Sequence, residues 1–106
     1  MSRTFDTYCI EAIDLEDARE RLEAVLSIRL VLHESMFWGG DYYLAKSDSF
    51  GEITIRRNYN SYTKELSEPN YPDCQIIVSV SVPLDPDALA AQLAEGGLRL
   101  LNRAVI

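Results

Sequence analysis

The sequence predicts an α+β protein in which one mixed β-sheet has the order β-α-β-β-β-β-α-β and both helices pack on one face of the sheet. Two observations predict this class. Apolar residues recur at helical spacing in two segments and alternate with polar residues in most of the others. A strand, a capped helix and a returning strand occur near each end of the chain, so each end is a βαβ candidate with a right-handed crossover. With 106 residues, the chain is predicted to form a single domain, residues 1–106.

The two helices are predicted from their start signals and their apolar stripes. Asp14 is a suitable N-cap for the first helix. The apolar residues that follow it share one helical face: Leu15, Ala18, Leu22, Val25 and Leu26. Asp85 and Pro86 combine an N-cap with proline at the first helical position, which predicts a second helix over 86–95. This Ala-rich helix is expected to stop at the Gly96-Gly97 pair.

Six segments have the composition and alternation of strands: 4–10, 29–37, 41–47, 52–58, 75–82 and 98–105. The Gly39-Gly40 pair predicts a hairpin turn, because glycine accepts the positive φ values of tight turns. The second, third and fourth strands should therefore form an antiparallel meander. Residues 59–74 have no clear period, and a loop of this length is usually functional or mobile.

Aromatic residues are concentrated on the meander and the long loop, and eight of the ten lie there: Phe37, Trp38, Tyr42, Tyr43, Phe50, Tyr59, Tyr62 and Tyr71. If both helices cover one face of the sheet, the opposite face is open to water or to a partner. Tyrosine and tryptophan combine a large rigid area with a polar tip, and they are enriched at interface hot spots. The aromatic hairpin is therefore a candidate recognition surface, although aromatics of a turn also commonly pack over a sheet edge.

The charge balance indicates the kind of partner. The chain has 17 Asp and Glu against 10 Lys and Arg, which gives a formal net charge of −7. This balance argues against a nucleic-acid partner, because duplex binding depends on cations that neutralise phosphates. A basic protein is the better complement for an acidic surface. The chain starts without the apolar core of a secretory signal and has no apolar run long enough to span a membrane, so we expect a cytoplasmic protein without a membrane partner.

The cysteines and the single histidine indicate neither a metal site nor a bound cofactor. Cys9 and Cys74 are expected to be reduced in the cytosol and to be small buried side chains, with a disulfide or a reactive thiol as the less common alternatives. Together with His33 they do not supply a tetrahedral zinc set. We therefore expect no metal and no cofactor.

Catalysis is the weakest of the functional readings. No serine elbow is present, and His33 is the only imidazole that could act as a base. Glu34 and Asp41 could approach each other across the Gly39-Gly40 turn and act as a carboxylate pair. A solvated pair is the more common outcome in an acidic protein, so the sequence predicts no enzyme.

The predicted interface combines the aromatic hairpin with the acidic long loop. The residues predicted to bind a partner are Glu34, Trp38, Asp41, Tyr42, Tyr43, Tyr62, Glu65, Glu68, Tyr71 and Asp73. Rings would fill pockets on the partner, while carboxylates would meet its lysines and arginines.

Three motifs carry a family resemblance: the run Glu34-Ser35-Met36-Phe37-Trp38-Gly39-Gly40-Asp41-Tyr42-Tyr43, the Arg57-Asn58 strand end and the Glu68-Pro69-Asn70-Tyr71-Pro72-Asp73 loop. With the Ile/Val strand that follows, they resemble small bacterial immunity proteins of contact-dependent growth inhibition and related polymorphic toxin systems, over residues 30–83. The resemblance implies a cytoplasmic antidote that binds one toxin domain, often a nuclease with a basic groove, and blocks it by occlusion.

The oligomer expected under this reading is a monomer or a weak homodimer. The alternative reading is a small-ligand-binding or regulatory α+β module, possibly dimeric, because the paired βαβ units resemble amino-acid-sensing domains in outline.

Overall fold

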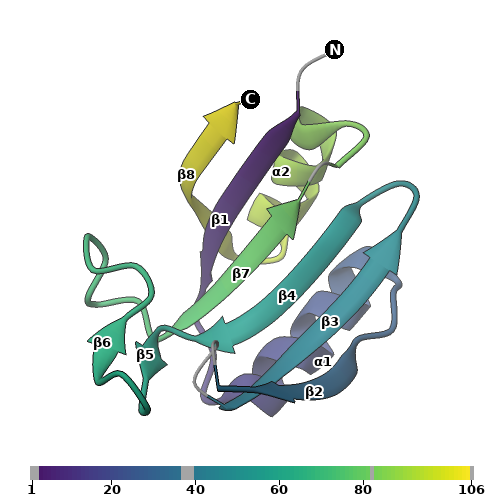
Figure 1. The fold of residues 1–106 in the computed structure, drawn as a ribbon. Coiled ribbons are helices and arrows are strands. Elements are labelled where there is room, and N and C mark those ends of the chain that lie inside the picture. The colour runs from purple at the N-terminus through teal and green to yellow at the C-terminus, as the bar shows by residue number, and fades with distance from the viewer. Residues whose placement is uncertain (1–2, 37–39, 82, 106) are drawn as a thin grey trace.

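The computed structural model describes residues 3–36, 40–81 and 83–105, and it has two layers, a six-stranded sheet and a pair of helices on one of its faces (Figure 1). The elements are β1 (Thr4–Ile10), α1 (Leu15–Leu26), β2 (Val31–Ser35), β3 (Gly40–Ser47), β4 (Gly51–Arg57), β5 (Tyr59–Asn60), β6 (Glu65–Leu66), β7 (Ile76–Ser81), α2 (Pro86–Glu95) and β8 (Leu98–Val105). The predicted class and the order of helices and main strands are confirmed. Within the predicted loop 59–74 the chain adds a short hairpin, β5 with β6.

The sheet order is β2-β3-β4-β7-β1-β8, and every neighbouring pair is antiparallel. The mixed pairing expected from two βαβ units is therefore absent from the described sheet. The two strands of each unit do run in the same direction, but they are never neighbours. Three strands separate β1 from β2, and β1 itself separates β7 from β8. In both units, other strands are therefore inserted between the two strands that the helix connects.

The main core lies between the sheet and the helices. Each helix buries one stripe of apolar residues: Leu15, Ala18, Leu22 and Leu26 of α1, with Leu89 and Leu93 of α2. These side chains pack on the helix-facing side chains of the central strands: Tyr8, Ile10, Ile53, Ile55, Ile76, Val78 and Val80. Burial of such aliphatic side chains contributes about 1.5–3 kcal/mol each, which makes this layer the main source of stability.

The predicted caps form at both helix starts. The Asp14 carboxylate accepts a hydrogen bond from the backbone N–H of Asp17 at 2.8 Å, and Asp85 accepts one from Ala88 at 3.1 Å. At the other end of α2, the Gly96 position faces α1 closely, because a Cβ there would lie 2.5 Å from Cγ2 of Val25. A glycine at this position lets the two helices approach on their shared face of the sheet.

A buried polar cluster ties β1, β8 and α2 together. The side chain of Asp6 is fully buried, and its two oxygens accept hydrogen bonds from Nε and Nη2 of Arg103, each at 2.9 Å. Arg103 also donates to Asp87 of α2 at 2.7 Å. The Tyr8 hydroxyl donates to Asp6 at 3.3 Å. Burial, followed by the neighbouring Asp6 carboxylate, raises the pKa of Tyr8 to about 12.

This shift predicts a loss of stability in alkali. An unfolded tyrosine ionises near pH 10, whereas Tyr8 in the folded protein holds its proton to about 12. The unfolded state therefore releases the proton first, and the free energy of unfolding should fall by about 2 kcal/mol as the pH rises from 10 to 12. Urea unfolding at several pH values should show this decline in the wild type and a shallower one in Tyr8→Phe. Equal slopes in the two proteins would contradict the assignment to Tyr8.

Candidate functional site

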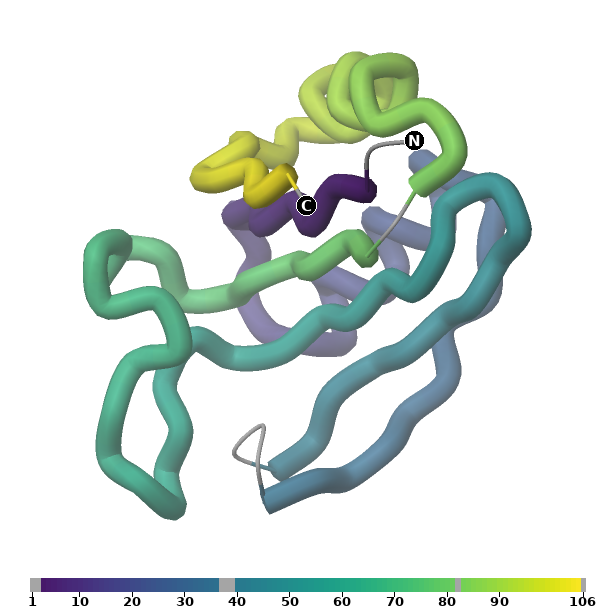
Figure 2. Tube along the Cα trace, turned by 45° about the horizontal axis from the view of Figure 1, so that its top comes forward, coloured from purple at the N-terminus to yellow at the C-terminus, as the bar shows by residue number. Residues whose placement is uncertain are grey.

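The candidate site lies at the end of the sheet where β4 finishes and β3 starts. The end of β2, the start of β3 and the segment 58–74 all lie at this end, as Figures 1 and 2 show. The arrangement follows from the register, because Tyr42 near the start of β3 lies opposite Arg56 near the end of β4. Segments that are distant in the sequence are thereby gathered at one end of the molecule.

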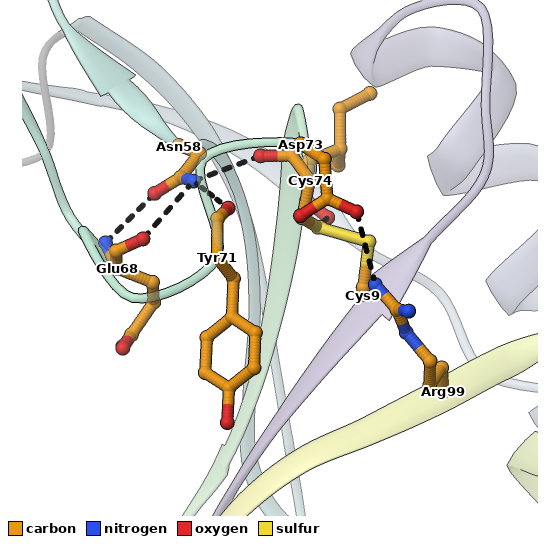
Figure 3. The surroundings of a disulfide bond; sticks show 8 residues. Cys9, Asn58, Glu68, Tyr71, Asp73, Cys74 and Arg99 are labelled. Atoms are coloured by element: carbon orange, nitrogen blue, oxygen red, sulfur yellow. Dashed lines mark hydrogen bonds and ion pairs between the residues drawn. A yellow bond between two sulfur atoms is a disulfide. The ribbon is translucent and has the colours of Figure 1, made fainter.

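Asn58 holds the projecting segment in place (Figure 3). Its buried amide nitrogen donates to the carbonyls of Tyr71 at 3.0 Å and Cys74 at 2.8 Å, and its amide oxygen accepts from the N–H of Glu68 at 2.7 Å. The Tyr71 hydroxyl adds a bond to the carbonyl of Leu101 in β8 at 2.8 Å. The Asn58 amide nitrogen also lies 3.5 Å from the carbonyl of Glu68, so one side chain contacts four backbone groups of a segment that has little regular structure of its own.

Removal of this amide should loosen the segment. In Asn58→Ala the four backbone groups lose their partner, and we expect a loss of about 2–3 kcal/mol in the free energy of unfolding. Limited proteolysis should also cut faster within 59–73 than in the wild type. Asn70→Ala, at an exposed position of the same segment, is the control and should leave both measurements unchanged. An Asn58→Ala protein as resistant as the wild type would contradict this role.

Cys9 and Cys74 form a disulfide with a Cα–Cα distance of 6.0 Å. The expectation of two reduced thiols is therefore wrong for this structure, although both residues are buried as expected. The bond joins β1 to the end of the projecting segment, 65 residues further along the chain. No local signal in the sequence could show that proximity, because it depends on β1 pairing with β7.

The face of the sheet opposite the helices is less open than the sequence suggested. A second, small core of Cys9, Cys74 and Ile77 lies on it, and Tyr71 and Leu101 pack against this core. One register row crosses this face from edge to edge: His33, Tyr42, Arg56, Ile77, Cys9 and Arg99. Arg56 in the middle of the row is buried, which lowers its pKa to about 10, and it donates to Ser79 Oγ at 2.6 Å. The aromatic docking face expected here is therefore replaced in part by packed structure.

Three hollows beside α1 adjoin one another through shared lining residues, and two of them reach Leu32 of β2. A cavity of about 360 Å³ and one of about 280 Å³ share Asp14, Leu15 and Arg57. The second cavity shares Glu16, Leu32 and Tyr43 with a third, of about 500 Å³, that reaches Arg29. We call the three together the acidic groove. Its charged lining residues are four carboxylates, Asp14, Glu16, Glu23 and Asp41, and three arginines, Arg19, Arg29 and Arg57.

Carboxylates of α1 surround one arginine on the wall of the groove. Arg19 forms ion pairs with Glu16, with Glu23 at 2.7 Å and with Glu20 at 3.7 Å, so three acids share one guanidinium. Hydrogen bonds from Arg19 and then Tyr43 lower the pKa of Glu16, which keeps it ionised. Burial, together with the hydrogen bond to Glu16, raises the pKa of Tyr43. This wall consequently retains negative charge.

A second group of carboxylate side chains lies on the opposite wall of the groove. Glu34 of β2 lies directly opposite Asp41 of β3, and both side chains are exposed. Like charges in directly opposed positions of neighbouring strands are destabilising. Arg57 lies in the same hollow as Asp41 and offsets part of this charge. The two carboxylates predicted from the sequence are therefore brought together as expected.

The two tyrosines of the predicted hairpin, Tyr42 and Tyr43, point to opposite faces of the sheet in the structure. Tyr43 is buried against α1, and its hydroxyl donates to Glu16 at 3.0 Å, so the expectation of an exposed Tyr43 ring is corrected. Tyr42 points to the opposite face, half-buried, and stacks on His33 with ring centroids 5.5 Å apart. Successive side chains of a strand point to opposite faces, so the two rings cannot share one surface. Trp38 lies outside the described residues.

The remaining predicted residues are divided between exposed positions and supporting ones. Tyr62 and Glu65 are exposed on the β5–β6 hairpin. Glu68 and Tyr71 are half-buried and belong to the part of the segment that Asn58 fixes. Asp73 is exposed and lies 3.8 Å from Arg99 of β8, away from the acidic groove.

Several exposed apolar side chains were missed from the sequence. Ile13 is 89% exposed at the mouth of the first cavity, and Leu32 is 54% exposed on β2. The signal for Ile13 was present in the sequence. An apolar residue before an N-cap normally packs on the fourth helical residue, but here that residue is Ala18, which is small and fully buried.

Within residues 3–36, 40–81 and 83–105, no group of histidine, cysteine and acidic side chains could hold a metal ion. Neither helix of that part of the chain is long and apolar enough to cross a membrane. Comparison of the chain with protein-family models, curated proteins and solved structures gives no match. The fold and site thus define a small α+β protein with an acidic groove beside an exposed sheet edge.

Proposed function

We propose that the protein binds a basic protein partner and neutralises it by occlusion, as an immunity protein does with its toxin domain, and that it acts by binding and not by catalysis. The observation that carries this proposal is the exposed pair of Glu34 and Asp41, directly opposite each other beside the acidic groove. A lysine or arginine of a partner placed between them would relieve their repulsion and gain charge-assisted hydrogen bonds.

Apolar anchors next to these acids support a protein partner. Leu32 and Met36 lie on either side of Glu34 in the chain and are 54% and 71% exposed. An interface needs such apolar groups at its centre, because surface ion pairs alone contribute about 0–1 kcal/mol each. The net charge of −7 would in addition speed the encounter with a cationic partner at low salt. If the partner uses lysines and arginines to hold phosphates, pairing with this surface would occupy those side chains and prevent phosphate binding.

The test is to mix the protein with the product of the gene immediately upstream, which should be a toxin domain, and to measure complex formation and loss of toxicity. Glu34→Gln combined with Asp41→Asn should weaken the complex by about tenfold or more at low salt. Asp48→Asn combined with Glu95→Gln removes the same charge from exposed positions outside the groove and should change affinity less than twofold. Absence of a complex, or equal effects of the two double variants, would remove the proposal.

The cytoplasmic location implied by the family resemblance is part of this proposal. It favours reduced cysteines, whereas the structure contains the Cys9–Cys74 disulfide. Cytosolic thiol systems keep cysteine pairs reduced, whereas disulfides persist in oxidising compartments. Alkylation of the protein in freshly quenched cells should therefore label both Cys9 and Cys74. An unlabelled pair would indicate an oxidising compartment and would remove the cytoplasmic part of the proposal.

One cavity favours the second candidate function, a small-ligand-binding or regulatory module. The 360 Å³ cavity has apolar walls from Ile13, Leu15 and Leu66 together with the polar groups of Arg57 and Gln75. Its size and mixed lining are typical of small-molecule sites. A thermal-shift screen of metabolites should find a stabiliser whose effect is lost in Arg57→Ala if this function holds, and no stabiliser if the groove serves only a protein.

A further inference from the structure

We propose that an extended, cationic strand of the partner adds to the outer edge of β2 and places every second side chain in the acidic groove beside α1. This inference rests on the proposed function for the charge of the partner, and it adds the geometry of the contact. It makes the interface one of strand addition, in which backbone hydrogen bonds give affinity and alternate side chains give selectivity.

β2 is an edge strand of the described sheet. β2 pairs with β3 on one side, and no other strand among the described residues pairs with its outer side (Figure 1). Its register with β3 runs without a bulge from Val31 to Ser35. Val31 and Leu32 are both more than half exposed, at 53% and 54%. An edge that is regular, exposes two adjacent apolar side chains and has no proline or lysine is a template for another strand.

The other edge of the sheet differs in each of these respects. The β1–β8 register shifts between Thr7 and Tyr8, and such an irregularity disturbs an edge strand. β8 also carries Arg99 and Arg103, each of which forms an ion pair. Positive charge and a bulge are the usual means of blocking edge association. The contrast assigns strand addition to β2 and not to β8.

The groove fixes the character of the added strand. Leu32 and Glu34 point to the helix side of β2, next to Tyr43 and Asp41 of β3. Successive residues of an added strand alternate between the two faces, so every second side chain would enter the groove. There it would meet the apolar surface of Leu32 or the carboxylates of Glu34 and α1. A strand that alternates apolar and cationic residues on this face fits both environments.

A second copy of the chain fits the same edge poorly. Self-pairing of β2 would bring the Glu34–Asp41 pair and the α1 carboxylates of one copy toward those of the other. Each copy carries a net charge of −7, so the repulsion would be largest at low salt, where a cationic strand binds best. The charge therefore selects a basic strand over a homodimer.

The experiment is an NMR titration of the isotope-labelled protein with three synthetic nine-residue peptides with blocked ends. One has lysine and valine in turn at its odd positions and threonine between them, so that lysine and valine alternate on the same face. One replaces every valine by proline, and one replaces every lysine by glutamate. We expect the Lys/Val peptide to shift the amides of β2, to slow hydrogen exchange along its outer edge, and to bind at least about tenfold more tightly than the other two. The Lys/Pro peptide has the same charge, but its prolines lack a backbone N–H and hold φ near the fixed proline value, which disfavours a regular strand.

A pair of matched variants completes the design. Leu32 and Leu100 are exposed leucines on the helix-facing side of the two edge strands, opposite Tyr43 and Tyr8. Leu32→Lys should weaken the Lys/Val peptide at least about tenfold, because it places a cation where the peptide needs an apolar contact. Leu100→Lys carries the same change on β8 and should alter binding less than twofold.

The outcomes separate this inference from the proposed function. Equal binding of the Lys/Val and Lys/Pro peptides, or shifts confined to β8, would overturn strand addition. Protection of β2 that appears without peptide and grows with protein concentration would assign the edge to a second copy and overturn it as well. If strand addition fails while the Glu34→Gln, Asp41→Asn variant still loses its partner, the proposed function stands on a different binding geometry. If strand addition holds and that variant binds its partner normally, the proposed charge recognition fails.

Discussion

Replacement of Asp6 by asparagine is expected to lower the free energy of unfolding by about 3–4 kcal/mol. The Asp6 side chain has no exposure to solvent and receives two hydrogen bonds from Arg103 and one from Tyr8. Asparagine removes the negative charge from the pair and puts an N–H₂ donor where an acceptor is needed. Loss of one partner from a buried ion pair is far more costly than loss of an exposed one.

The molecule contains its own control for this prediction. Asp87 binds the same guanidinium at 2.7 Å, but its side chain is 89% exposed. Asp87→Asn should therefore cost less than about 1 kcal/mol. Urea unfolding of both variants, extrapolated to water, measures the difference directly. Equal losses in the two variants would show that burial does not determine the strength of this cluster.

Reduction of the Cys9–Cys74 disulfide is expected to have the second large effect. A bond that closes a loop of 65 residues stabilises a protein by about 4 kcal/mol when it restricts the unfolded chain. Oxidised and reduced protein should differ by about this amount in urea unfolding. Hydrogen exchange should rise most in the segment 58–74, because the bond and Asn58 together fix it to the sheet.

A double variant, Cys9→Ala with Cys74→Ala, serves as the reference for reduction. It should resemble the reduced wild type, and a reducing agent should leave its stability unchanged. If reduction leaves the wild type as stable as before, the segment depends on Asn58 alone and the disulfide contributes nothing to the fold.

Local chemistry explains which parts of the fold the sequence could predict. Both N-caps, the two apolar stripes and the alternating strands depend on neighbours within a few residues. Asp14 and Asp85 accordingly cap helices at the predicted positions. The order of strands in the sheet depends on pairing between segments that are distant in the sequence, and local composition does not determine that pairing. The antiparallel pairing throughout the described sheet is therefore a finding of the structure.

In the candidate site too, features set by neighbouring residues could be predicted, whereas features set by tertiary packing could not. Glu34 and Asp41 face each other because a hairpin joins them, and hairpin geometry can be read from glycine and sequence spacing. The faces taken by Tyr42 and Tyr43 depend on the phase of β3, and a shift by one residue would exchange them. Burial of Tyr43 against α1 decides that phase. The acidic groove forms where the end of β4, much further along the chain, lies beside α1 and β2, so it could not be predicted from local patterns.

Hydrogen exchange of the protein with and without its basic partner tests the central claim most directly. If the partner occupies the acidic groove, protection should increase over residues 31–36 of the β2 edge and over 16–23 of α1, and it should decline as salt is added. The hairpin β5–β6 should gain less protection, and α2 and β8 should gain none. Protection that appears instead on α2 and β8, with β2 unchanged, would contradict the account.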